Sequence, residues 1–178
     1  MKRWRILFFL CAASLLLGCN TATALPIVLY NLLPGTSFQE GCGGPCMCPV
    51  MASGNVKGTF GVVSSGGVGQ TKALPATMSY KLRDIAWTVF DTTGQVIHTI
   101  TGEGTYQYRR VGVGVVKQQL TLKISIDGQD PISLDSGQLV GYGRFPAFAV
   151  SARSDTGCFE VEMDIVAARA PLTAVKQQ

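Results

Sequence analysis

The chain has few of the residues on which most enzymes depend. It contains one histidine, His98, and only two tryptophans in 178 residues, and charged residues make up 15% of the total. A serine or cysteine nucleophile usually needs a positioned base, and a single histidine leaves few such pairings. His98 lies in an apolar, alternating stretch, so we interpret it as a structural strand residue. We predict a protein that is not an enzyme.

Clustered positive charge is also missing. The 15 basic residues outnumber 11 acidic ones, but three of the basic residues fall within the first five positions, ahead of an apolar run. Binding to nucleic acid rests on clustered contacts to phosphates, so we expect no nucleic-acid partner. Arg109, Arg110 and Lys117 form the densest basic spot of the remainder, and we interpret it as a solvated strand end.

Motifs for calcium and carbohydrate chemistry are incomplete. Asp127, Asp130 and Asp135 do not have the spacing of an EF-hand loop, and we interpret them as turn residues. The acidic residues of Glu160–Asp164 alternate with large apolar residues. That alternation favours a solvent-facing strand over the paired carboxylates of a glycosidase.

The first 24 residues have the layout of a bacterial export signal. A basic start is followed by the apolar run Ile6–Leu17. The end of this segment, Leu16-Leu17-Gly18-Cys19, resembles a lipobox, where a bacterial lipoprotein precursor is cut and acylated on cysteine. The resemblance implies removal of residues 1–18, a lipid on Cys19 and a membrane anchor in the cell envelope. With Asn20 next, it implies the outer membrane in a Gram-negative host.

A second cleavage site is compatible with the same signal. Ala22-Thr23-Ala24 has the small-x-small pattern, and cleavage after residue 24 gives a secreted or periplasmic protein that starts at Leu25. The apolar run is short for a membrane-spanning helix, which needs about 20 residues. Both cleavage sites therefore predict an exported protein.

Four cysteines follow the signal: Cys42, Cys46, Cys48 and Cys158. An even number in an exported chain indicates two disulfides. Because one residue separates Cys46 from Cys48, a bond between these two would strain the chain. We expect one of the three clustered cysteines to join Cys158, which would tie the N-terminal segment to the last strand.

The same cluster offers an alternative chemistry. Thiolates at Cys42, Cys46 and Cys48, with the thioethers of Met47 and Met51, would suit Cu(I). The cluster contains no histidine, and its spacing differs from the CxxC pairs of zinc ribbons and thioredoxin-like proteins. We therefore predict structural disulfides and no cofactor, with a soft-metal or thiol-redox protein as the alternative.

The rest of the chain alternates between apolar and polar residues. Leu120–Ile126 and Phe159–Ile165 each place their apolar side chains on one face, as a half-buried strand does. Ile85–Val89 has a shorter apolar face, and the apolar residues of Met78–Leu82 fall on the opposite parity. A bulge near Asp84 would bring both sets to one side.

Turn signals separate the strands at the spacing of sandwiches and small barrels. Asp127–Pro131 has the composition of a hairpin loop. We expect an all-β fold, an antiparallel β-sandwich or a small β-barrel, with roughly eight or nine strands in the β domain 56–168. Residues 19–55 are expected to form a tether and an irregular, disulfide-tied, Cys-rich arm, and 169–178 a tail.

Together these features predict a non-catalytic exported protein of the cell envelope. We expect a lipid-anchored β domain with a binding or structural role, attached to the membrane through its N-terminal lipid. The partner would be an envelope protein or ligand that the sequence does not identify. A second alternative is a carrier of hydrophobic ligands, which requires a cavity inside a barrel.

Overall fold

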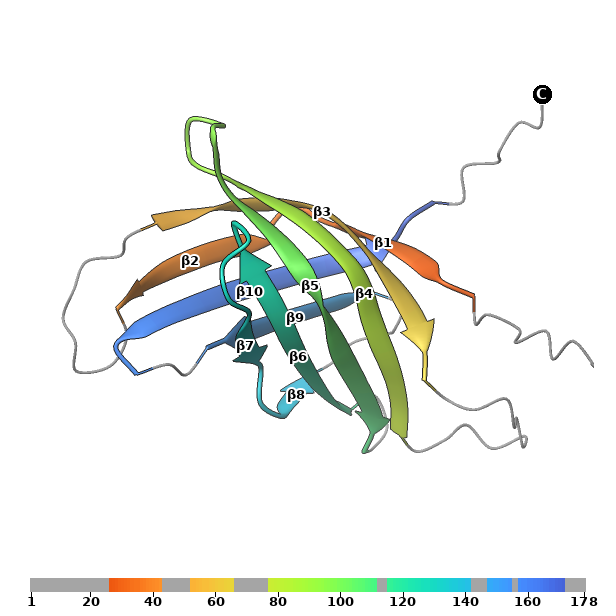
Figure 1. Ribbon diagram of the computed structural model, residues 1–178. Coiled ribbons are helices and arrows are strands. Elements are labelled where there is room, and N and C mark those ends of the chain that lie inside the picture. Colours follow the sequence, from red (N-terminus) through yellow and green to blue (C-terminus); the bar gives the residue numbers. More distant parts are fainter. Residues whose placement is uncertain are drawn as a thin grey trace, which may run out of the picture.

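The computed structural model describes residues 26–42, 52–65, 77–111, 115–141, 147–154 and 157–171. The regular structure in these residues consists of ten strands, shown in Figure 1: β1 (Val28–Leu32), β2 (Ser37–Cys42), β3 (Ala52–Ser64), β4 (Thr77–Phe90), β5 (Val96–Arg110), β6 (Val116–Ile126), β7 (Ile132–Asp135), β8 (Leu139–Gly141), β9 (Phe148–Arg153) and β10 (Phe159–Arg169). No helix that could cross a membrane occurs among these residues. The predicted all-β class is confirmed.

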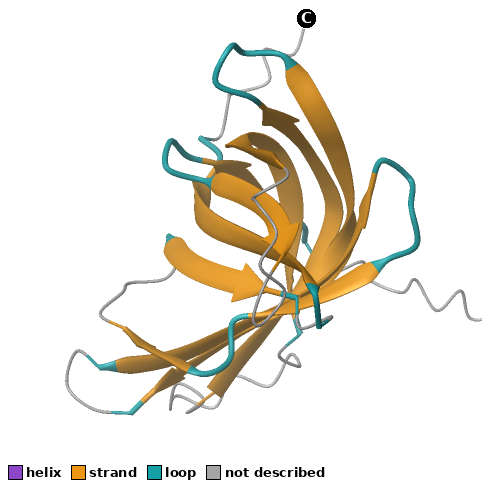
Figure 2. Cartoon of the chain, turned by 90° about the vertical axis from the view of Figure 1, so that its left-hand side faces the viewer, coloured by secondary structure: helices purple, strands orange, loops and turns teal. Residues whose placement is uncertain are grey.

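The strands form one antiparallel sheet that closes into an irregular ring (Figure 2). Their order is β1-β10-β2-β3-β4-β5-β6-β7-β9, and β9 pairs with β10 to close the ring. β1 and β2 pair with different parts of both β3 and β10, while β7 and β8 pair with different parts of β6. β1 and β2 therefore together occupy one strand position of the ring, and β7 and β8 together occupy another.

The inward side chains of the strands form one core. Tyr30 and Phe60 stack with ring centroids 5.5 Å apart, and Phe60 meets the edge of Trp87 at 6.0 Å. Trp87 is 2% exposed. Apolar burial of this kind is the main favourable contribution to folding.

The predicted bulge in β4 is confirmed. Asp84 has a φ of 53°, and the register between β4 and β5 shifts between Leu82 and Ile85. Leu82 and Ile85 are three positions apart, yet both are buried. The extra residue changes the parity of the strand and keeps both apolar sets in the core.

Strand number and hairpin position also agree with the sequence. The eight strands β3 to β10 span the predicted β domain. Asp127–Pro131 joins β6 to β7, which pair antiparallel from Thr121 with Asp135 to Ile124 with Ile132. In β6 and β10, the two strands predicted from alternation, most of the apolar residues face the core, but Phe159 at the start of β10 is 42% exposed.

The expected irregular arm is wrong for its two described segments. β1 and β2 both lie between β3 and β10, and both are integral to the ring. β1 was missed because it is apolar on both faces: Tyr30 is buried, whereas its neighbour Leu29 is 51% exposed. A strand of this kind lacks the alternation by which half-buried strands are recognised.

Candidate functional site

The cysteine cluster is described only in part. The predicted lipidation site and most of the cluster lie outside the described residues: Cys19, Cys46, Met47, Cys48 and Met51. Cys42 ends β2 and pairs with Phe159, next to Cys158. The sulfurs of Cys42 and Cys158 are disulfide-bonded, but the cysteine to which each is joined stays a prediction. The two cysteines lie where β2 and β10 run side by side, so a staple here would join adjacent strands.

The acidic residues of β10 form an outward row. Asp164 accepts hydrogen bonds from the hydroxyls of Ser37 on β2 and Ser151 on β9. Glu160 lies 3.9 Å from Arg153, and Glu162 is exposed. The solvent-facing row that the alternation predicted is therefore present, and Asp164 and Glu160 contact side chains of neighbouring strands.

His98 lies between two carboxylates from different parts of the ring. Its Nδ1 lies 2.7 Å from Oδ2 of Asp127, in the β6–β7 turn, and its Nε2 lies 3.3 Å from Oε1 of Glu40, on β2. The ring also packs against Phe38, with centroids 5.4 Å apart. β2 and β5 are not neighbours in the sheet, so this bridge links strands that share no backbone hydrogen bonds.

Both imidazole nitrogens of His98 are engaged, which supports a structural role. A general base needs a ring nitrogen within reach of a substrate proton. Asp127 also accepts hydrogen bonds from the N–H and hydroxyl of Thr99, at 2.7 and 3.1 Å. The hydrogen bonds from His98 and from Thr99 hold the pKa of Asp127 below its usual value.

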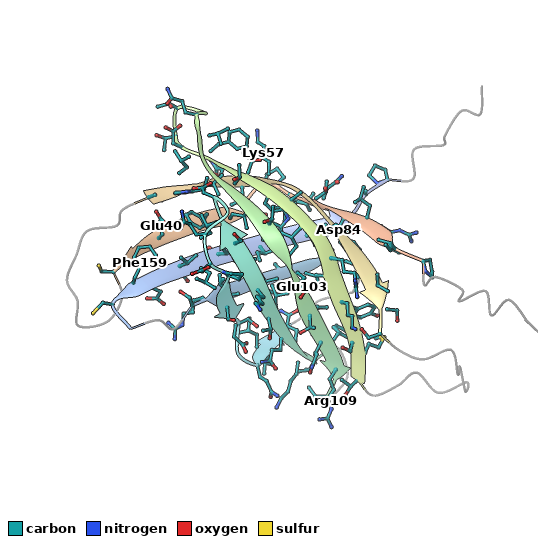
Figure 3. All side chains as sticks on the ribbon, viewed as in Figure 1. Glu40, Lys57, Asp84, Glu103, Arg109 and Phe159 are labelled. Carbon is teal, nitrogen blue, oxygen red and sulfur yellow. The ribbon has the colours of Figure 1, made fainter. Side chains whose placement is uncertain are left out.

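A hollow lies on the outer side of the ring, across β4, β5 and β6. We call it the β4–β6 hollow. It has a volume of about 300 Å³ and is lined by Lys81, Leu82, Arg83, Glu103, Gly104, Thr105, Thr121, Leu122, Lys123 and Ser133. Figure 3 labels Glu103 on β5, near the centre of this wall, and Asp84 on the neighbouring β4.

Strand register explains why these side chains gather. Lys81 pairs with Thr105, which pairs with Thr121, so these three form one row across the strands. Glu103, Lys123 and Ser133 form a second row. Because side chains alternate along a strand, residues two apart in these rows project from the same outer face. Two polar rows therefore border the hollow.

The charges around the hollow do not neutralise one another. Lys81, Arg83, Glu103 and Lys123 are exposed. Within the described residues, none of these four side chains forms an ion pair or a hydrogen bond. Glu103 and Lys123 are direct cross-strand partners, yet their charged atoms lie too far apart for an ion pair. Three cations and one carboxylate are left available to a ligand.

This set of groups suits a small anion that also carries hydroxyls. Ammonium and guanidinium groups bind phosphate or carboxylate, with arginine able to present two parallel N–H donors. The hydroxyls of Thr105, Thr121 and Ser133 donate and accept hydrogen bonds, and Glu103 accepts them from a ligand's hydroxyls. A phosphorylated or carboxylated sugar has both kinds of group.

The sequence did not point to the hollow. The densest basic spot that it identified contains Arg109 and Lys117, which pair directly across β5 and β6 and border a smaller hollow of about 160 Å³. The cations of the β4–β6 hollow are spread over two strands and are brought together by register alone. The one feature of the sequence that bears on the hollow is the spacing of Lys81 and Arg83, which are two residues apart and therefore project from the same face of the strand.

Comparison of the chain with protein families, curated proteins and solved structures finds no significant match. The resemblance to a lipobox at Leu16–Cys19 stays a prediction, because these residues lie outside the described part of the chain.

Proposed function

We propose that this protein is an exported, lipid-anchored, non-catalytic binding protein of the cell envelope. Its β ring would hold the β4–β6 hollow toward an anionic, hydroxylated ligand of the envelope. The observation that carries the proposal is the set of uncompensated charges around the hollow, Lys81, Arg83 and Lys123 with Glu103. The export-type signal that ends at Cys19 supports the compartment.

The two alternative functions have less support. A soft-metal or thiol-redox site needs free thiolates, whereas Cys42 and Cys158 are disulfide-bonded. A carrier of hydrophobic ligands needs an internal cavity, whereas the described core residues Tyr30, Phe60 and Trp87 contact one another ring to ring. The proposal therefore places binding on the outer surface.

Intact mass tests the compartment half of the proposal. The protein is expressed in a bacterial host and purified in detergent without reductant. We expect a mature chain that starts at Cys19 and carries acyl groups. A chain that starts at Leu25 would overturn the lipid anchor and leave a secreted protein.

Nuclear magnetic resonance tests the binding half. The ¹⁵N-labelled mature chain is titrated with glucose 6-phosphate, and with glucose and inorganic phosphate as separate arms. We expect saturable shifts of the Gly104 and Leu122 amides with the sugar phosphate, weaker shifts with phosphate, and none with glucose. The affinity should fall as salt is added, because exposed charges are screened.

Lys123→Gln is the matched loss-of-binding variant, and Lys117→Gln is its control. Both lysines are exposed on β6, but only Lys123 borders the β4–β6 hollow. One exposed charge contact contributes up to about 1 kcal/mol, so we expect Lys123→Gln to weaken binding by roughly three- to five-fold and Lys117→Gln to leave it unchanged. Equal effects of the two variants would overturn the hollow as the site.

A further inference from the structure

Exposed apolar side chains gather along β1 and at the residues that flank it. Seven large apolar side chains of the described residues are exposed, and three of them lie within seven positions: Ile27, Leu29 and Leu33, exposed by 58, 51 and 37%. The other four are dispersed along the chain. We call these three residues the β1 face. A concentration of apolar surface marks an interaction site more often than scattered single residues do.

The β1 face is a formed part of the sheet. Leu29 pairs with Gly61 on β3, and a Cβ atom placed at Gly61 would lie only 2.7 Å from Cγ2 of Ile27. The side chain of Ile27 therefore lies flat across Gly61. The apolar surface is held in place by strand pairing on both sides of β1, with β3 and with β10.

We infer that the β1 face rests on the lipid bilayer to which the chain is anchored. This inference rests on the proposed acylation of Cys19. Eight residue steps separate Cys19 from Ile27, which limits the distance between their Cα atoms to about 28 Å. β1 is the first strand of the described chain after Cys19.

The anchor makes a small apolar face sufficient for contact. Three side chains alone bind a bilayer weakly, since interfacial binding scales with the buried apolar area. A short tether turns this second contact into an intramolecular event with a high effective concentration. Arg169, exposed on β10, is the cross-strand partner of Tyr30 and so projects from the other face of the sheet. The carboxylate of Asp84 lies near Gly61, beside Ile27, at the edge of the β1 face.

The ring order then fixes the orientation of the molecule. From β1 the ring reaches β6 through β3, β4 and β5 in one direction and through β10, β9 and β7 in the other. β6 therefore lies across the ring from β1, and Figure 1 shows β1 and β6 on different sides of the molecule. With β1 on the bilayer, the β4–β6 hollow faces away from that bilayer, toward the space in which an envelope ligand would be met.

Quenching by brominated lipids tests this orientation on the full, acylated protein. Leu29→Trp places a fluorophore on the β1 face, and Val140→Trp places a control on β8, which pairs with β6 and whose Val140 is 64% exposed. Each variant is reconstituted in phosphatidylcholine–phosphatidylglycerol vesicles with and without bromine on the acyl chains. Emission is compared with that of the unaltered protein, in which Trp87 is buried.

We expect the added emission of Leu29→Trp to shift to the blue and to fall about two-fold or more with brominated lipid, because interfacial groups sit about 5 to 10 Å into the bilayer. The added emission of Val140→Trp should stay unchanged. Vesicle-bound protein with both tryptophans unquenched, or with Val140→Trp the more strongly quenched, would overturn the orientation and leave the lipid anchor intact. Protein that lacks acyl groups by mass and does not sediment with vesicles would overturn the anchor and the inference together.

Discussion

At the scale of single residues, Thr36 holds the turn between β1 and β2. It is 1% exposed, and its Oγ1 lies 2.9 Å from the carbonyl oxygens of both Leu33 and Val166. The same oxygen accepts a hydrogen bond from the N–H of Val166 at 3.1 Å. One buried hydroxyl thus connects the turn to β10.

Thr36→Val is expected to destabilise the fold by about 1 to 3 kcal/mol, because it leaves buried backbone groups without their partner at nearly constant volume. Urea unfolding, followed by circular dichroism, measures the change. Thr36→Ser keeps the hydroxyl and should retain most of the stability. A Thr36→Val variant as stable as the unaltered protein would contradict the role given to the hydroxyl.

The lowered pKa of Asp127 predicts that the stability of the fold depends on pH. Its pKa is lowered in the folded protein by hydrogen bonds from His98 and Thr99. A carboxyl with a lowered folded-state pKa stabilises the fold above its unfolded-state value, about 3.9 for aspartate, and this contribution is lost as the pH falls. Asp127→Asn should therefore be less stable than the unaltered protein at pH 6, and the difference should shrink below about pH 4.

The control for this prediction is Asp130→Asn, in the same turn. Asp130 is exposed, and within the described residues it forms no hydrogen bond or ion pair. Urea unfolding at several pH values between 6 and 3 compares the three proteins. A difference between Asp127→Asn and the unaltered protein that stays constant over this range would contradict the electrostatic explanation.

At the scale of elements, the bulge in β4 decides which side chains enter the core. Asp84 adopts a left-handed conformation, with φ at 53°. A β-branched residue tolerates this region poorly, so Asp84→Val is expected to cost about 1 to 2 kcal/mol. Asp84→Gly removes the steric conflict and should match or exceed the original stability. Arg83→Val, at the next exposed position, is the control, and an equal loss there would contradict the argument.

Local patterns predicted those elements whose two faces differ. The change of parity between Met78–Leu82 and Ile85–Val89 was enough to place the bulge, because each half kept a clear apolar face. β1 and β2 were not predicted. In β1, the exposed residue Leu29 is as apolar as its buried neighbour Tyr30. In β2, the charged residue Glu40 contacts His98 across the ring. Contacts between strands that are not neighbours leave no periodic trace in the sequence.

The candidate site could not be predicted from the sequence for the same reason. Lys81, Arg83 and Lys123 come from two strands separated by β5, and their proximity depends on the registers of β4 with β5 and of β5 with β6. One-residue slips in register would turn these side chains into the interior. Register follows from the complete set of strand pairings and cannot be read from one segment.

At the scale of the whole molecule, the ring has a weak seam between β7 and β9. A single residue pair, Asp135 with Arg153, joins these strands. The side chain of Gln118 on β6 also links β5 to β9. Tyr106 donates a hydrogen bond to its Oε1 at 3.0 Å, and its Nε2 donates to the carbonyl of Ala149 at 3.3 Å. Burial raises the pKa of Tyr106 above its usual value, so its hydroxyl keeps the proton that it donates.

Because local opening follows the weakest pairing, β9 is expected to exchange its amide hydrogens well before β4 and β5. Gln118→Leu removes two hydrogen bonds, each contributing about 1 kcal/mol, and should speed exchange in 147–153 by roughly ten-fold or more. Gln107→Leu, on the outer face of β5, should change nothing there. Hydrogen exchange with mass spectrometry reads the peptides separately. If β9 and β4–β5 instead accelerate together in Gln118→Leu, the ring opens as one cooperative unit, and the seam is as stable as the rest of the sheet.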